Sequence, residues 1–279
     1  ANAVHGLAYD SANNLIYFSG IGGVFGFYNI SSNTTKSLML TDESNFMGLG
    51  FAKVLAYDSA NKLIYIGVSD NGIFGFYNIS SNLTKSLMET DESNFIGVND
   101  VRAVAYDSTN NLIYVGGWAG VYGFYNISSN TTKSLMQTDE SNFMGVDTVM
   151  YLAYDSANKL IYFVGANGVY GFYNISSNTT KSLMLTDESN FMGLTFMRAL
   201  AYDSANNLIY FGGNDGVFGF YNISSNTTKS LMQTDESNFI GTNAVTTVTY
   251  DSTNNLIYVG GGAGVYGFYN ISSNTTKSL

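Results

Sequence analysis

The sequence predicts an all-β chain built from six four-stranded repeats. The string Ala-Tyr-Asp-Ser begins at residues 8, 56, 105, 153 and 201, and a copy that starts with Thr begins at residue 249. Successive copies are therefore spaced by 48 or 49 residues. No part of the repeat shows a sustained helical periodicity, and the chain contains 30 Gly, 22 Tyr and 19 Phe, which suits a packed, aromatic-rich sheet. A strand-rich period of roughly 40 to 50 residues is typical of a propeller blade, so we expect a six-bladed β-propeller.

The third repeat shows why each strand is expected. The first strand is predicted at Val101–Tyr106, and it is followed by Asp107–Asn111, whose side chains favour a turn by bonding to their own backbone. The second strand, Leu112–Gly116, is continuously apolar, as expected where both faces of a strand are covered. Glycines then allow a tight connection to a third strand at Gly120–Ile127, and a fourth strand is predicted at Thr132–Met136.

We expect one propeller domain over residues 1–279. Its blades should span residues 1–48, 49–97, 98–145, 146–193, 194–241 and 242–279. Leu279 corresponds to Leu38 and Ala1 to Leu49, so the six copies lack only one connector, equivalent to Met39–Gly48. A chain cut between blades has no overlapping strand to close a ring, which favours a module of a longer chain or a subunit that neighbours help to hold.

The turn, strand, Gly-Gly, strand pattern resembles a known class of tandem repeats. It is similar to the propeller repeats of archaeal and bacterial surface and sensor proteins, such as the YVTN and regulator-propeller families. The YVTN tetrapeptide itself is replaced by Leu-Ile-Tyr followed by Phe, Val or Ile, and the regulator-type Trp of the second strand is Tyr. The resemblance implies a propeller fold and says little about activity, because propellers serve many functions.

Composition excludes several classes of function. The chain has no Cys and a single His, which removes disulfide frameworks, thiolate metal sites and His-dependent triads. A net charge of -10 argues against a nucleic-acid partner. No stretch approaches the roughly 20 apolar residues that a membrane span needs. We therefore expect no catalytic residues, no metal, no cofactor, no nucleic acid and no membrane span.

One end of each predicted blade carries an almost invariant hairpin, Tyr-Asn-Ile-Ser-Ser-Asn-Thr-Thr. Each hairpin holds two Asn-x-Ser/Thr sequons, and their repetition at one structural position predicts N-linked glycans. The alternative is that this string is good turn chemistry that was copied with the blade. The candidate acceptors are Asn29, Asn33, Asn78, Asn82, Asn126, Asn130, Asn174, Asn178, Asn222, Asn226, Asn270 and Asn274.

The opposite end of the blades holds nearly all the sequence variation within the chain. Divergence that is concentrated in loops at one end favours recognition of a ligand or partner, although relaxed constraint on exposed loops would look the same. A second variable column places cations and the single His in the segment that begins each blade, where they would form an anion or sugar-acid site or else offset nearby acids. The candidate binding residues are Trp118, Asp70, Asn71, Asn167, Asn214, Asp215, His5, Lys53, Arg102 and Arg198.

Other repeated features have simpler expected roles. Asp10 and its copies should organise the turn that follows them. The pair Phe27-Tyr28 and its copies could stack on sugars, but packing between blades is favoured. The connector acids would hold calcium or form a solvated acidic loop, and the loop is favoured; they are Asp42, Asp91, Asp139, Asp187 and Asp235.

These observations lead to one favoured function and two alternatives. We expect a non-enzymatic structural or adhesive glycoprotein, extracellular or on the cell surface, that is part of a larger surface or filamentous assembly. Its partners would be N-linked glycans, copies of itself or other surface proteins, since repetition provides multivalent contacts. The main alternative is a lectin-like module that binds carbohydrate between blades at the variable end. An enzyme of the propeller hydrolase or lyase type is the least favoured, because catalysis needs one asymmetric site.

Overall fold

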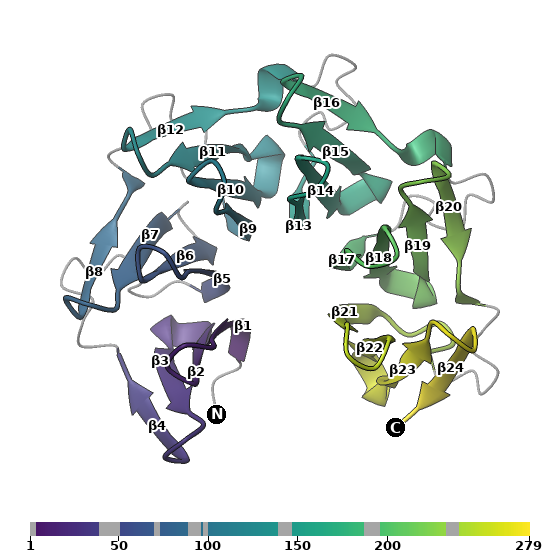
Figure 1. The fold of residues 1–279 in the computed structure, drawn as a ribbon, viewed down its shortest axis with the longest axis horizontal. Helices are drawn as coiled ribbons and strands as arrows, with labels where there is room; N and C mark the ends of the chain where they lie inside the picture. Colours follow the sequence, from purple (N-terminus) through teal and green to yellow (C-terminus); the bar gives the residue numbers. More distant parts are fainter. Residues whose placement is uncertain are drawn as a thin grey trace. The chain divides into compact units, whose positions relative to one another are not determined.

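A computed structural model describes residues 4–38, 51–69, 73–88, 96, 100–138, 147–186, 196–232 and 240–279. It confirms the predicted fold class: six four-stranded antiparallel sheets, each a blade, in which the strands pair in chain order (Figure 1). Each sheet lies within one of the six predicted blade ranges. In the part of the chain that is described, no helix is long and apolar enough to span a membrane.

The chain divides into two compact units, Ala1–Gln137 and Thr138–Leu279, each with three blades. The strands of the first unit are β1 Val4–Asp10, β2 Leu15–Gly20, β3 Phe25–Asn29, β4 Thr34–Ser37, β5 Phe51–Asp58, β6 Leu63–Ser69, β7 Ile73–Asn78, β8 Leu83–Ser86, β9 Val101–Asp107, β10 Leu112–Gly117, β11 Tyr122–Asn126 and β12 Thr131–Ser134. Those of the second are β13 Val149–Asp155, β14 Leu160–Gly165, β15 Tyr170–Asn174, β16 Thr179–Ser182, β17 Met197–Asp203, β18 Leu208–Gly213, β19 Phe218–Asn222, β20 Thr227–Ser230, β21 Val245–Asp251, β22 Leu256–Gly261, β23 Tyr266–Asn270 and β24 Thr275–Ser278.

The third and fourth strands are shorter than the sequence predicts. In blade three the third strand begins at Tyr122, because Trp118–Gly120 forms a 3₁₀ turn whose central residue, Ala119, has a positive φ of 54°. The fourth strand ends at Ser134, and Met136–Thr138 forms a second 3₁₀ turn. Both differences arise because a tight turn is formed by residues whose side chains are also compatible with a strand.

Apolar cores fill the spaces between neighbouring blades of each unit. In the first unit, Tyr17 and Phe25 of blade one pack around Tyr77 of blade two, with ring centroids 6.2 and 5.5 Å from the Tyr77 ring. In the second unit, Tyr162 and Tyr170 of blade four surround Tyr221 of blade five in the same way, at 6.1 and 6.0 Å. The tyrosine of the predicted Phe-Tyr pair is therefore a packing residue between blades, as expected.

Asp10 and its copies bind the turn after the first strand. In blade four, Asp155 is fully buried and accepts hydrogen bonds from the backbone N–H groups of Ala157 and Asn158 and from the Asn158 amide, at 2.8 to 3.0 Å. Tyr202 of blade five donates a fourth bond to this carboxylate at 2.9 Å. One carboxylate thus holds its own turn and joins two blades of the second unit.

Backbone hydrogen bonds bring the loops of each blade together at two ends. We call the end with the turn between the first two strands and the hairpin between the last two the hairpin end, where for example Ile30 N–H donates to the Asn14 carbonyl at 3.0 Å. We call the other the variable end, where Trp118 N–H donates to the Asp100 carbonyl at 2.9 Å. The meander therefore places the repeated loops at one end of the blade and the divergent ones at the other.

Candidate functional site

The first sequon asparagine of every hairpin closes the third strand and holds a turn. Its Oδ1 accepts the backbone N–H of the serine three residues later at 3.0 Å, as in the Asn78–Ser81 pair. Because Oδ1 is committed to backbone donors, the amide orientation is set and Nδ2, the atom that carries an N-linked sugar, lies on the other side. These half-buried asparagines are Asn29, Asn78, Asn126, Asn174, Asn222 and Asn270.

The second sequon asparagine is exposed at the tip of the hairpin. It adopts the left-handed conformation, with φ between 55° and 60°, which asparagine tolerates better than most residues. Its Oδ1 accepts a hydrogen bond from the hydroxyl of a tyrosine five residues earlier, for example from Tyr125 to Asn130 at 2.9 Å, so here too the orientation of the amide is set. The members of this set are Asn33, Asn82, Asn130, Asn178, Asn226 and Asn274, with equivalent bonds of 2.8 to 2.9 Å.

Burial keeps five of these tyrosines in the form that donates. It raises the pKa of Tyr77, Tyr125, Tyr173, Tyr221 and Tyr269 above the ordinary tyrosine value, because an ionised phenol would lose its hydration. The neutral hydroxyl therefore anchors the asparagine of the tip to the core between blades.

The hydroxyl residues of the two sequons differ in exposure. The serine of the first sequon is exposed in the described hairpins, whereas the threonine of the second is buried in five blades, at 4 to 7% exposure for Thr84, Thr132, Thr180, Thr228 and Thr276. In the second unit the hydroxyls of Thr138 and Thr186 lie 2.5 Å from those of Thr180 and Thr228. In these two blades a threonine of the preceding connector thus contacts the threonine of the second sequon.

Trp118 and Arg102 come together at the variable end of blade three. The Trp118 side chain is 47% exposed, and the Arg102 guanidinium lies over its ring, 5.0 Å from the centroid. Arg102 also forms a 2.7 Å ion pair with Asp100. An exposed aromatic face next to a guanidinium and a carboxylate is a chemical surface that suits a polyhydroxylated ligand.

Two further pairs form within single blades of the second unit. Arg198 donates from Nε to the side-chain Oδ1 of Asn214 at 2.5 Å, and Asn167 donates from its side-chain amide to the Asp147 carboxylate at 2.6 Å. Asn167 and Asp215 are exposed and occupy the positive-φ centres of their 3₁₀ turns, at 53° and 55°. The arginines that we consider candidate ligand groups are therefore engaged by polar residues of their own blade.

The variable column lies at a β-bulge in the first strand of each blade. In β1 the pairing register shifts between Val4 and Gly6, which leaves His5 as the extra residue, and β5 shifts in the same way around Lys53. The equivalents in the other blades are Arg102, Met150, Arg198 and Thr246. His5 is exposed and Lys53 is half-buried. A bulge turns a side chain out of the regular alternation, a feature that the apolar pattern of the strand does not reveal.

Some candidate residues lie outside the part of the chain that is described. They are Asp70 and Asn71 of the variable end and the connector acids Asp42, Asp91, Asp139, Asp187 and Asp235. Among the described residues, no group of three or more His, Asp or Glu side chains is placed to hold a metal ion.

Comparison with known proteins bears on the fold. No family model matches this chain, and no curated protein matches it. Among solved structures 1531 chains match, one of which is the crystal structure of the computationally designed Ika8 protein, with a TM-score of 0.66 at 15% identity. That match covers 100% of this chain and 74% of the designed one. The likeness is one of fold alone. An architecture that so many chains share leaves function to be argued from the loops.

Proposed function

We propose that this chain is a non-enzymatic, extracellular structural or adhesive glycoprotein whose hairpin ends carry N-linked glycans. The observation that carries the proposal is the geometry of the second sequon. All six hairpins present its asparagine in the same exposed, left-handed conformation, with Oδ1 bonded to a tyrosine hydroxyl. A sugar attached there projects away from the blade without displacing a core residue.

The repetition of the blades supports a structural role within an assembly. Six near-copies offer the same contact many times, which favours multivalent association with copies of this chain or with other surface proteins. The resemblance of the repeats to those of YVTN and regulator-type prokaryotic surface proteins supports the same location, at the cell surface or outside the cell.

Mass spectrometry of the chain, purified from its native source or from a secreting, glycosylating host, tests the proposal. We expect an intact mass above that of the polypeptide and sugar-bearing peptides that contain the tip asparagines. Threonine-to-alanine changes such as Thr132→Ala should remove the sugar at Asn130 alone, which controls for modification elsewhere. A chain of unmodified mass from its native source would refute the glycoprotein role. A chain that remains monomeric by sedimentation at high concentration and by electron microscopy of native material would refute the assembly role.

A lectin-like function is the second candidate, and the exposed Trp118 with the half-buried Arg102 over its ring favours it. Trp118 is the only tryptophan in the chain, so intrinsic tryptophan fluorescence reports directly on this surface. If the surface binds carbohydrate, a glycan array should give signals that Trp118→Ala abolishes and that Trp118→Phe partly retains. Arg102→Lys, which keeps the charge and loses the planar stacking surface, should weaken the same signals. Silence of the wild-type chain across a broad array, with no fluorescence change, would refute this candidate.

A further inference from the structure

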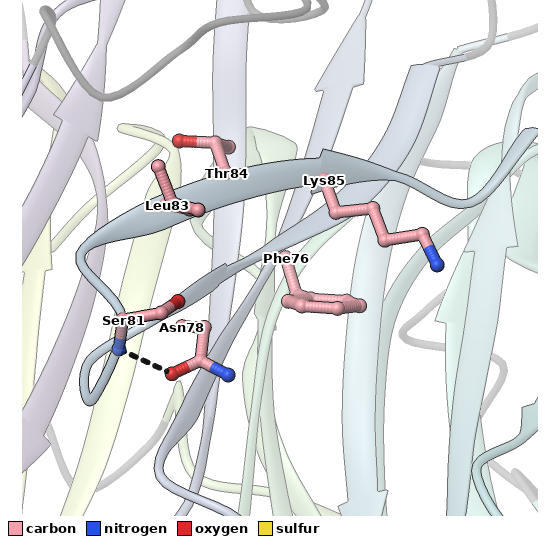
Figure 2. Close-up of a pocket in the computed structure, with 6 residues that line it drawn as sticks. All are labelled: Phe76, Asn78, Ser81, Leu83, Thr84 and Lys85. Atoms are coloured by element: carbon pink, nitrogen blue, oxygen red, sulfur yellow. Dashed lines mark hydrogen bonds between the residues drawn. The ribbon is translucent and has the colours of Figure 1, made fainter.

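A groove of about 350 Å³ lies beside the first sequon asparagine of blade two. It is lined by Phe76, Asn78, Ser81, Leu83, Thr84 and Lys85 (Figure 2). The β7–β8 ladder pairs Phe76 with Lys85 and Asn78 with Leu83, so the half-buried Phe76 ring is two residues from the acceptor along one strand. Alternation along a strand places residues two apart on the same face of the sheet.

The Asn78 amide is oriented for this groove. Its Oδ1 accepts the backbone N–H groups of Ser80 and Ser81 at 2.9 and 3.0 Å. Figure 2 shows the amide oxygen turned to Ser81 and the nitrogen on the side where Phe76 lies. Within the described residues, no hydrogen-bond acceptor holds Nδ2. A group attached to that nitrogen therefore leaves the turn on the side where Phe76 lies.

Leu83 distinguishes the hairpin of blade two from the other five hairpins. The other hairpins have Thr at this position, and in those hairpins its hydroxyl lies 2.7 to 2.8 Å from the hydroxyl of a serine two residues earlier. Blade two lacks that contact and instead exposes 43% of a leucine next to Asn78. An apolar side chain left open to water beside an aromatic ring is stabilised when something covers it.

We propose that the first sugar linked to Asn78 Nδ2 lies in this groove, with its C–H face on Phe76 and Leu83 and its polar substituents near the Lys85 ammonium. The inference rests on the proposed glycosylation and adds that the sugar is a packed part of the blade. The apolar face of a pyranose ring gains from covering an aromatic surface, and an ammonium supplies three donors to sugar hydroxyls or an acyl oxygen. The same Phe and Lys pair faces the first sequon in the other blades, as Phe27 with Lys36 and Phe124 with Lys133 illustrate.

The test is a double-mutant cycle on the full glycosylated chain. Ser80→Ala destroys the sequon at Asn78 and keeps both Asn78 and the backbone donors of its turn. Leu83→Thr introduces, at an exposed position, the residue that the other five blades carry, so this variant should fold. Phe76→Leu removes the aromatic ring. We expect each of these two changes to lower the midpoint of thermal unfolding more in the chain with the sugar than in the Ser80→Ala background. Phe76→Tyr, which keeps an aromatic face, should retain most of the stabilisation that the sugar provides.

The possible outcomes separate this inference from the proposed function. If Asn78 carries a sugar but the midpoint shifts are equal with and without Ser80→Ala, the sugar does not pack in the groove, and the proposed glycosylation is unaffected. If peptide mapping finds Asn78 bare while tip asparagines are modified, this inference is overturned and the proposed function survives. If no asparagine carries a sugar, both are overturned.

Discussion

Asparagine at the hairpin tip serves two purposes. Asn130 adopts a positive φ of 57° and accepts the Tyr125 hydroxyl at 2.9 Å. The first property is tolerance of the left-handed backbone conformation, and the second is a hydrogen bond to a tyrosine of the core between blades. Both were invisible in the sequon pattern, which identifies the residue only as a candidate acceptor.

Substitution at this position should separate the two contributions. In unglycosylated protein, Asn130→Ala should lower the free energy of unfolding by about 1 to 3 kcal/mol, since alanine is strained at positive φ and the Tyr125 bond is lost. Asn130→Gly should lower it by about 1 kcal/mol less, because glycine relieves the strain and forfeits only the bond. Denaturant unfolding provides the measurement. Equal losses for the two variants would mean that the left-handed conformation contributes nothing.

At the scale of the element, close contact between blades depends on glycine in the second strand. A Cβ on Gly212 of β18 would clash with Val245 of β21 in the next blade. Blade four carries Val164 at the equivalent position, and there the neighbouring strand offers Met197 in the same core. A flexible methionine adapts to the larger Val164, whereas a branched valine would not. In these two contacts, the size of the second-strand residue therefore matches the side chain that the next blade packs against it.

Gly212→Ala should therefore be costly. Overpacking at this contact is expected to lower the free energy of unfolding by about 1 to 3 kcal/mol, since both the Val245 side chain and its backbone oxygen are near the added methyl group. The matched control is Gly260→Ala in β22, where the added methyl meets only the exposed Thr247 side chain, which can rotate away. We expect the control to change stability little. A comparable loss in both variants would indicate that strand propensity, and not the contact between blades, controls the cost.

The sequence predicted most of each element and missed features that depend on partners across the sheet. The apolar run Leu112–Gly116 and the turn after Asp107 were predicted because their signals are local, and β10 and its preceding turn confirm them. The bulge at Arg102 could not be predicted, because it is defined by which residues of β10 pair with which residues of β9. The bond from Tyr202 to Asp155 escaped prediction for the same reason, since 47 residues separate its two ends.

For the candidate sites the sequence predicted residue identity better than surroundings. The sequon pattern identified twelve candidate acceptors, but it did not distinguish a half-buried asparagine in a turn from an exposed one at a tip. The variation between blades likewise placed Trp118 and Arg102 at one end of the blade, without indicating that the guanidinium stacks on the indole. Such contacts arise from side-chain directions at bulges and tight turns, which composition does not encode.

At the scale of the whole molecule, the repeated burial of tyrosine should make the free energy of unfolding decrease at alkaline pH. Burial, with help from the Asp58 carboxylate, raises the pKa of Tyr106 to about 12, and burial raises the pKa of Tyr65, Tyr162 and Tyr210 further above that of free tyrosine. Residues of this kind occur in both units, so the effect should not be confined to one of them.

We expect the free energy of unfolding to fall as the pH rises above about 10. An unfolded tyrosine ionises near pH 10 whereas the folded one keeps its proton, so the stabilisation is complete below about pH 10 and is lost as the pH rises through about 12. Thermal unfolding over this range, followed together with tyrosinate absorbance, provides the measurement. Tyr106→Phe should make the decline shallower. Stability that stays constant from pH 10 to 12 would contradict the burial of the ionisable hydroxyls.

The bulge in the first strand of each blade also explains where duplicated blades can diverge. The pairing register skips the extra residue, so the neighbouring positions of the ladder stay paired whichever side chain it carries. The sheet therefore restricts the type of side chain at this site little, and His, Lys, Arg, Met and Thr occupy it in the different blades. Variety in this column measures mutational tolerance, and selection for binding has to be demonstrated residue by residue. The same tolerance makes it a suitable position for introducing six different chemical groups, one per blade, into an otherwise uniform scaffold.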